Sequence, residues 1–325
     1  MSVVPILQVE QVVKQFEGLR AVDGLSFDVR AGEVFGFLGP NGAGKTSTLR
    51  MILGITRPDS GAIRFEGRPA LDGSRVGYLP EERGLFEDAP VIDMLVYLGA
   101  LRGMSRRDAR VSALRWLERL ELADGARKKL NTLSKGNQQK VQFAGALLHR
   151  PVLAILDEPF SGLDPLNQET FIAIIRGLCE DGVAVLLSAH QLNLAERLCD
   201  RFLLIARGRR VLAGTLDSMR DQVAGGARDV LTVRMRGGSV ADVEAALERA
   251  APGAERRIES IDGAFSLEII LATGTDLNRL LTSLAGGPRI ERVEMRPLPL
   301  HEIYLRAVRH EREVTIEEAG EVAGV

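Results

Sequence analysis

The chain has 325 residues, enough for two domains with separate hydrophobic cores. Its hydrophobic fraction of 45% and charged fraction of 26% are ordinary for a globular protein, and a net charge of -2 argues against a nucleic-acid partner. No segment reaches the roughly 18 uninterrupted apolar residues that a membrane-spanning helix needs, and no signal peptide is predicted. Cys179 and Cys199 are expected to be small buried side chains, not a disulfide or a metal site.

The N-terminal third of the chain begins with predicted strands. Residues Ile6 to Phe16 and Val22 to Val29 alternate apolar and polar side chains, which predicts an antiparallel pair. The apolar run from Val34 to Leu38 predicts a buried parallel strand. A glycine-rich turn follows, and residues Ser47 to Leu53 are typical of the first turns of a helix.

The turn has the sequence Gly39-Pro40-Asn41-Gly42-Ala43-Gly44-Lys45-Thr46, which matches the P-loop pattern G-x-x-x-x-G-K-[ST]. Glycines let successive N–H groups point at one anion, and the helix dipole adds positive potential there. An accidental glycine-rich turn is the alternative, which the strand and helix on either side disfavour. We expect Lys45 to reach the β- and γ-phosphates and Thr46 to ligate Mg²⁺. The expected phosphate-binding set also contains Gly39, Pro40, Asn41, Gly42, Ala43, Gly44 and Ser47.

Farther along the chain, short apolar blocks separated by helical patterns predict a parallel sheet covered on both faces. These blocks are Val76–Leu79, Val152–Leu156, Val183–Ser188 and Phe202–Ile205. The interval between the first two blocks is poor in strand patterns and has helical apolar spacing. We interpret residues from about 88 to 148 as a helical insertion in an α/β core.

The composition shifts after Thr215. Asp217 to Val223 predicts a short helix, and Gly225-Gly226 predicts a joint. From Val230 to Met295 the pattern is strand, helix, strand, helix, strand, which predicts a small α+β domain. We therefore expect a first domain over residues 1–220, a second over 225–312, and a disordered tail over 313–325.

Two carboxylates follow the second apolar block at the end of a predicted strand. Asp157 is expected near the P-loop Mg²⁺, and Glu158 beside the γ-phosphate, where it would accept a proton from the attacking water. A solvated strand end is the commoner explanation of an Asp-Glu pair by itself. The P-loop in the same chain favours the catalytic interpretation.

The run Leu133-Ser134-Lys135-Gly136-Asn137-Gln138-Gln139 lies between the P-loop and these carboxylates. It resembles the Leu-Ser-Gly-Gly-Gln signature of the ATP-binding-cassette family, with Lys135 and Asn137 as departures. The resemblance covers roughly Ile6 to Thr215 and implies an α/β P-loop NTPase core with an antiparallel β subdomain and a helical insertion. It also implies ATP hydrolysis with Mg²⁺, and that Ser134, Gly136 and Asn137 contact the γ-phosphate held by an opposite subunit.

The resemblance assigns roles to four further residues. Phe16 would stack on the adenine ring, although an ordinary core phenylalanine is the alternative. Asp164 would lie in the loop that crosses the dimer interface, and His190 would contact the γ-phosphate. Glu81 replaces the family's usual glutamine beside Mg²⁺, where an ionised carboxylate would repel phosphate unless it ligates the metal.

A folded insertion between Lys45 and Ser134 keeps the signature from folding back onto its own P-loop. We therefore expect a dimer, with a second copy or with a paralogous ATPase subunit. The resemblance implies a separate transmembrane permease that docks near Leu85-Phe86, and a location at the cytoplasmic face of the membrane. Pro297 to Leu305 resembles the end of exporter-type subunits, which favours export. The alternative is a mechanotransmission ATPase that pulls on a membrane partner without moving a solute.

Overall fold

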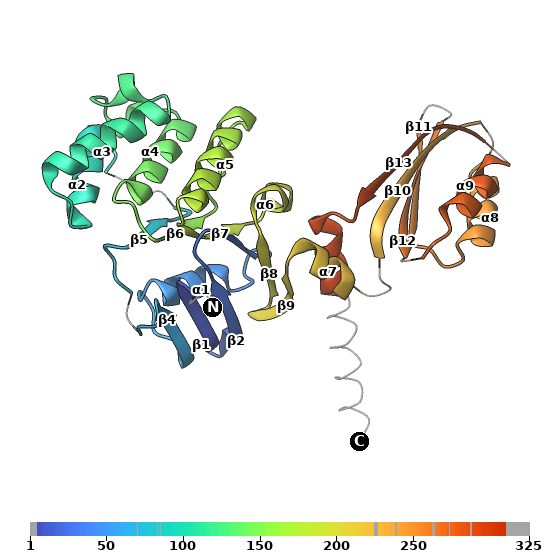
Figure 1. The fold of residues 1–325 in the computed structure, drawn as a ribbon, viewed down its shortest axis with the longest axis horizontal. Coiled ribbons are helices and arrows are strands. Elements are labelled where there is room, and N and C mark those ends of the chain that lie inside the picture. Colours follow the sequence, from blue (N-terminus) through green and yellow to red (C-terminus); the bar gives the residue numbers. More distant parts are fainter. Residues whose placement is uncertain are drawn as a thin grey trace. The chain divides into compact units, whose positions relative to one another are not determined.

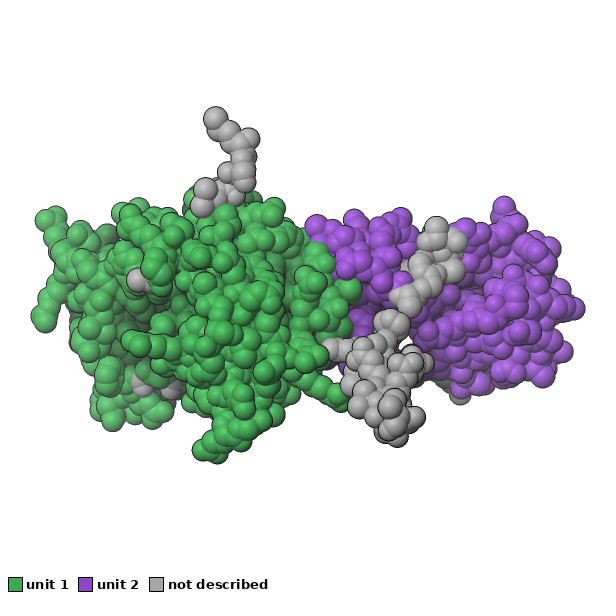
Figure 2. All heavy atoms as spheres, turned by 90° about the horizontal axis from the view of Figure 1, so that it is seen from below, with its two compact units in different colours: residues 1–214 green, residues 215–325 purple. Residues whose placement is uncertain are grey.

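The computed structural model describes residues 5–69, 71–82, 84, 86–223, 227–237, 239–261, 264–272, 274–286 and 288–309. The chain divides into two compact units, residues 1–214 and 215–325 (Figure 2). The predicted joint at Gly225-Gly226 and the predicted tail over 313–325 lie outside the described residues. No helix in the described part of the chain combines the length and the apolar character that crossing a membrane requires.

The first unit contains two sheets (Figure 1). The smaller, antiparallel sheet has the order β2-β1-β4, with strands β1 (Leu7–Phe16), β2 (Leu19–Val29) and β4 (Ser60–Phe65). The larger sheet has the order β5-β6-β7-β3-β8-β9 and is parallel except for β9. Its strands are β3 (Val34–Leu38), β5 (Val76–Leu79), β6 (Leu153–Asp157), β7 (Ala184–Ala189), β8 (Arg201–Ala206) and β9 (Arg209–Gly214).

This architecture confirms the predicted antiparallel pair and the predicted parallel strands. Strands β4 and β9 were not predicted. Both lie at sheet edges and carry few buried apolar side chains, so their sequences lack the pattern that marks an interior strand.

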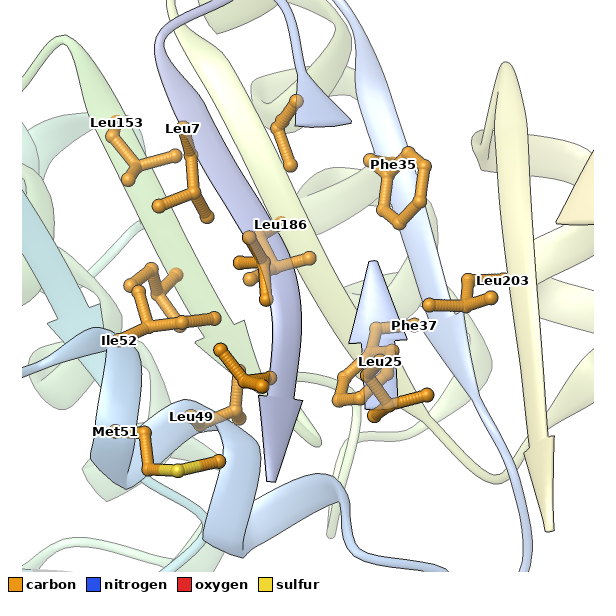
Figure 3. Close-up of a cluster of buried hydrophobic side chains, with 14 of the residues drawn as sticks. Leu7, Leu25, Phe35, Phe37, Leu49, Met51, Ile52, Leu153, Leu186 and Leu203 are labelled. Carbon is orange, nitrogen blue, oxygen red and sulfur yellow. The ribbon is translucent and has the colours of Figure 1, made fainter. Parts of the chain in front are cut away.

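The core between the two sheets positions the P-loop. Leu7 and Leu25 of the small sheet gather with Phe35 and Leu186 of the large sheet in one buried cluster (Figure 3). Helix α1 (Lys45–Ile52) contributes the buried side chains of its apolar face to the same cluster. Burial of each such side chain stabilises the fold by about 1.5–3 kcal/mol, so the helix that follows the loop is firmly held.

The predicted insertion is helical, as expected. It contains α2 (Val91–Leu101), α3 (Arg106–Arg119), two short 3₁₀ turns (Ala123–Gly125 and Leu130–Thr132) and α4 (Lys135–Leu147). Helices α5 (Pro165–Glu180) and α6 (Leu192–Leu198) belong to the α/β core. Phe143 of α4 stacks on Phe171 of α5 with ring centroids 4.1 Å apart, which joins the insertion to the core.

The second unit is an antiparallel sheet with two helices packed on one face. The sheet order is β11-β12-β10-β13. The elements are α7 (Leu216–Gln222), β10 (Ala227–Arg236), α8 (Val240–Ala250), β11 (Arg256–Ile261), β12 (Ala264–Ala272), α9 (Leu277–Ala285) and β13 (Arg289–Pro297), and residues 300–309 are helical.

Two details of this unit differ from the sequence-based expectation. Strand β11 was not predicted, because its arginine, glutamate and serine residues outnumber its apolar ones. Helix α7 belongs to the second compact unit, whereas the expected first domain ran to residue 220. The helix over residues 300–309 is fixed by Leu300 and Ile303, whose side chains are fully buried.

Candidate functional site

The loop between β3 and α1 wraps around the side chain of Lys45. The Nζ atom of Lys45 donates hydrogen bonds to the carbonyl oxygens of Gly39 at 2.7 Å and Pro40 at 3.2 Å. These bonds fold the loop back on itself, while Thr46 stays exposed on its outer side. The loop therefore has the closed, ring-like form that can surround a phosphate group.

Two glycines of this loop are required by its geometry. A Cβ atom on Gly39 would lie 2.4 Å from the carbonyl oxygen of Ile205, and one on Gly44 would lie 2.4 Å from that of Ala21. Gly44 also has a φ of 103°, in the left-handed region that other residues rarely adopt. As the N-cap of α1 it provides no side-chain acceptor, so N–H groups of the first helical turn stay available for an anion.

Three carboxylates, those of Glu158, Asp157 and Glu81, act electrostatically on Lys45. Burial raises the pKa of Asp157 to about 6; the charges of Glu81 and Glu158 add to this shift, and the charge of Lys45 opposes it. Burial lowers the pKa of Lys45, and the same three carboxylates oppose that shift. The negative charges of these carboxylates act on one another, so a cation bound in the cavity would lower their mutual repulsion.

Glu158 is held in an unusual backbone conformation. Its φ is 50°, and its N–H donates to the carbonyl oxygen of Ser188 at 2.9 Å. The carboxylate is nearly buried and lies 2.7 Å from the Nδ1 atom of His190, whose side chain is 55% exposed. A left-handed backbone at a residue with a Cβ atom costs on the order of 1 kcal/mol and is often found at functional sites. The structure thus places Glu158 and His190, the two residues predicted to be catalytic, in direct contact.

A cavity of about 680 Å³ opens in front of the loop, in the size range of ligand pockets. Its described lining comprises Phe16, Leu19, Arg20, Ala21, Pro40, Asn41, Gly42, Gly44, Lys45, Thr46, Ser47, Glu81, Asp157, Glu158 and Arg207. Phe16 is 45% exposed, so the alternative of an ordinary core phenylalanine is wrong. Gly39 and Ala43, also expected to bind phosphate, are buried in the loop and do not belong to this described lining.

Sequence analysis missed Arg20 and Arg207 as lining residues. Arg207 precedes Gly208 in the turn between β8 and β9, and the N–H of Gly208 donates to the carbonyl oxygen of Ala43 at 2.9 Å. Arg20 follows the turn at Gly18 between β1 and β2. A glycine marks each of these turns in the sequence, but only the order of the strands in the sheets brings the turns to the loop between β3 and α1.

The remaining predicted residues gather elsewhere in the unit. Ser134 caps α4, accepting the N–H of Asn137 at 3.3 Å, and Asp164 caps α5. A Cβ atom on Gly136 would lie 3.5 Å from the carbonyl oxygen of Gly162, so the starts of the two helices are neighbours. None of these residues is among the described residues that line the 680 Å³ cavity. The signature segment and the loop before α5 therefore form a second group (the signature group), separate from the residues that line this cavity (the P-loop group).

Helix α4 also fixes the segment that contains Glu81. The side-chain amide of Gln142 donates to the carbonyl oxygens of Pro80 at 3.2 Å and Glu82 at 3.1 Å, one on each side of Glu81. Gln142 is 4% exposed. This link was not predicted, because glutamine in a helix has no sequence signal for a distant backbone partner.

A family model described as ABC transporter matches residues 22–161. The chain is 38% identical over 305 residues to the uncharacterized ABC transporter ATP-binding protein YhaQ of Bacillus subtilis, covering 93% of this chain and 98% of that protein. It is 40% identical over 219 residues to the Nod factor export ATP-binding protein I of Burkholderia thailandensis, covering 66% of this chain and 72% of that protein. A solved structure of an ATP-binding subunit of an ABC transporter has a TM-score of 0.62 and 33% identity, covering 67% of this chain and 92% of that chain.

Proposed function

This chain belongs to the ATP-binding proteins of ABC transporters, a family of ATPases, and on that premise we propose that it powers an exporter. Two copies close around two ATP molecules and separate after hydrolysis, and this cycle drives a separate transmembrane permease. A paralogous ATPase subunit can take the place of the second copy. The observation that carries this proposal is the separation of the P-loop group from the signature group within one chain.

The signature group has the properties expected of one half of an ATP site that two subunits share. Helix α4 has no acidic residue in its first turn, and Ser134 accepts only the N–H of Asn137 among the bonds described for its hydroxyl. The helix start is therefore a positive end with room for an anion. Packing within one chain does not demand a glycine at Gly136, since a Cβ atom would make only ordinary contacts there. A γ-phosphate carried by a partner's P-loop would account for both features.

The P-loop group fits the remaining part of Mg-ATP. The exposed ring of Phe16 offers a stacking surface for adenine, and the loop offers N–H groups for the phosphates. Thr46, Asp157 and Glu81 supply the oxygen donors that Mg²⁺ prefers. In the described part of the chain no three Asp, Glu, His or Cys side chains are grouped to hold a metal by themselves, so phosphate and water oxygens would complete the coordination. Bound Mg²⁺ would supply charge neutralisation of the phosphates.

The protein's own groups then perform the hydrolysis. Lys45 places a positive charge against the β- and γ-phosphates. Glu158 accepts a proton from the attacking water, and its strained backbone fixes where the carboxylate points. His190 holds that carboxylate at 2.7 Å and, from its exposed position, can contact the γ-phosphate. Ser134 and Gly136 of the partner copy close the site.

The two units of the chain have different roles in this proposal. We assign nucleotide binding to the first unit, residues 1–214, with the insertion over about 88–148 facing the permease, and an accessory role to the second unit. Phe86 and Tyr97 are 62% and 49% exposed and meet edge to face at 5.9 Å, which offers an aromatic surface for a permease helix. The neighbouring Leu85 lies outside the described residues. Docking there would hold the subunit at the cytoplasmic face of the membrane.

Two observations support export. The Nod factor export ATP-binding protein I is a relative over two thirds of this chain. The segment Pro297 to Leu305, which resembles exporter subunits, leads into a helix with buried Leu300 and Ile303. Purifying the chain with its permease and measuring solute movement in vesicles tests this part. A complex that hydrolyses ATP and changes the partner's conformation without moving any solute would favour the mechanotransmission alternative.

A complementation experiment tests the composite site. Lys45→Ala inactivates the P-loop group and Ser134→Arg blocks the signature group, so each variant alone should be inactive. Mixing them should restore partial ATP hydrolysis, because a mixed dimer contains one site with both groups intact. In parallel, Glu158→Gln should bind Mg-ATP without turnover and sediment as a dimer. Absence of restored activity, together with a monomeric Glu158→Gln protein at saturating Mg-ATP, would refute the proposal.

A further inference from the structure

Strand β13 lies at one edge of the sheet in the second unit, and in the described part of the chain no strand pairs with its outer side. It is exposed along almost its whole length. Val293 and Met295 are 42% and 53% exposed, although their cross-strand partners Val233 and Leu231 are buried in the core with α8 and α9. Cross-strand partners point to the same face, so the apolar surface continues from the core to the open edge. Such an edge is a template for pairing with another strand.

The hydrogen-bond register shows which backbone groups face outward. The N–H of Leu298, directly after β13, donates to the carbonyl oxygen of Arg228 at 2.7 Å. Hydrogen-bonded positions alternate along an antiparallel ladder, so Glu294 bonds toward β10. Val293 and Met295 consequently direct their N–H and C=O groups to the open edge. These are the same residues that expose apolar side chains.

We propose that β13 pairs antiparallel with β13 of a second copy of this chain, with Val293 of both copies at the two-fold axis. The two sheets then join into one. The outward N–H and C=O groups of Val293 bond across the axis, and the two valine side chains cover each other. In this register Arg292 of each copy lies opposite Glu294 of the other, so symmetry creates the oppositely charged contact twice.

Charge selects this register over its nearest alternative. Arg292 and Glu294 are exposed at the edge and lie 2.9 Å apart in an ion pair within one strand. Moving the axis by one residue, to Glu294, would keep outward groups paired but would place Glu294 opposite its own copy. It would also place Arg292 opposite Arg296. Both contacts are like-charged and unfavourable. An axis at Met295 would place Glu294 opposite Arg296, but it would also set Pro297, which has no N–H, opposite Val293 and lose a hydrogen bond twice. Charge and hydrogen bonding together therefore favour the register about Val293.

This contact goes beyond the ATP-dependent dimer of the proposed function. It uses no residue of the P-loop or signature groups and requires no nucleotide. Two copies held at β13 would stay together while their ATP-binding faces are open. The tether would raise the effective concentration of each face for the next closure.

Sedimentation equilibrium of the full chain without nucleotide tests the pairing. The wild-type protein should form a dimer, and Arg292→Glu or Glu294→Arg alone should weaken it about tenfold by creating like-charged contacts twice. The double variant restores opposite charges and should regain an affinity within about threefold of wild type. Both side chains are well exposed, so none of these changes should affect folding.

A crosslinking experiment gives an independent measurement. Val293→Cys should be joined to its copy by a short bifunctional thiol reagent, while Glu259→Cys on the opposite edge strand β11 should not. Cys179 and Cys199 are buried and contribute little background. A nucleotide-free chain that stays monomeric, charge variants that dimerise like wild type, or equal crosslinking at both positions would overturn the proposal.

The two dimer contacts can be told apart in one further sample. Glu158→Gln combined with Arg292→Glu should dimerise with Mg-ATP and should dimerise about tenfold more weakly than the Glu158→Gln protein without nucleotide. If the β13 pairing is wrong, Arg292→Glu changes nothing in either condition. If the proposed function is wrong, Mg-ATP has no effect on the Glu158→Gln protein, whatever residue stands at 292.

Discussion

Gln142 and Pro80, 62 residues apart in the chain, are joined by a hydrogen bond of 3.2 Å from the side-chain amide to the backbone carbonyl oxygen. A second bond to Glu82 makes the same amide span the backbone around Glu81. Helix α4, whose start carries the signature segment, therefore sets the position of a carboxylate in the P-loop cavity. A movement of α4 would therefore displace the backbone around Glu81, and a movement of that backbone would displace α4.

The first prediction concerns this link. Gln142→Ala should leave two carbonyl oxygens unpaired, which costs about 1–3 kcal/mol of folding free energy. It should lower the ATP turnover rate more than ATP affinity, because Glu81 loses its position while the phosphate loop keeps its own bonds. Urea unfolding and steady-state hydrolysis measure the two effects. Ser112→Ala, which removes a 2.7 Å bond to Leu148 elsewhere in the insertion, is the matched control and should reduce stability without the turnover defect.

The second prediction compares two glycines. Gly136→Ala should leave stability unchanged or raise it by about 0.5–1 kcal/mol, because alanine favours helices and its Cβ finds ordinary space. Its ATP hydrolysis should nevertheless fall at least about tenfold if a partner's phosphate binds there. Gly39→Ala should instead destabilise the fold, since its Cβ would lie 2.4 Å from a backbone oxygen. Thermal unfolding with hydrolysis rates checks both, and normal hydrolysis by Gly136→Ala would contradict the composite site.

The third prediction concerns Phe16. Its ring is 45% exposed in the cavity, so Phe16→Ala should barely change stability. Loss of stacking should weaken ATP binding by about 1–2 kcal/mol, whereas Phe16→Tyr should preserve it. Titration of a fluorescent ATP analogue measures both affinities. Equal binding by all three proteins would mean that the adenine lies elsewhere.

The fourth prediction is a pH dependence set by Asp157. Its pKa is raised from 3.8 to about 6, so the folded state holds the proton more tightly than the unfolded state does. This contribution to stability is full below the unfolded pKa and is lost as the pH rises through about 6. Above that range the buried charge costs about 1–3 kcal/mol, and Asp157→Asn should remove the cost.

Thermal melts in the presence of a chelator, without nucleotide, check this prediction. Asp157→Asn should be more stable than wild type near pH 8, with a smaller difference near pH 5. Asp164→Asn serves as the control, because hydrogen bonds from Asn167 lower the pKa of Asp164, and its charge does not oppose folding. A stabilisation of Asp157→Asn that is equal at both pH values would exclude burial of the charge as the cause.

Much of the fold could be predicted because its signals are local. The P-loop depends on glycines within eight consecutive positions, and the strand-loop-helix context lies directly beside it. Ser134 and Asp164 are helix caps whose roles depend on residues three positions later. Interior parallel strands are buried on both faces, which gives them continuous apolar runs. Edge strands such as β11 bury too little to leave such a pattern.

The sequence by itself determined the chemical groups of the nucleotide site and the order in which they occur. Only the tertiary structure decided which of them meet. Strand order brought Arg20 and Arg207 to the cavity, placed His190 against Glu158, and kept Gly136 in a separate group. The physical reason is that such contacts depend on sheet register and helix packing between distant segments, where burial of apolar side chains fixes the geometry and no short sequence pattern records it.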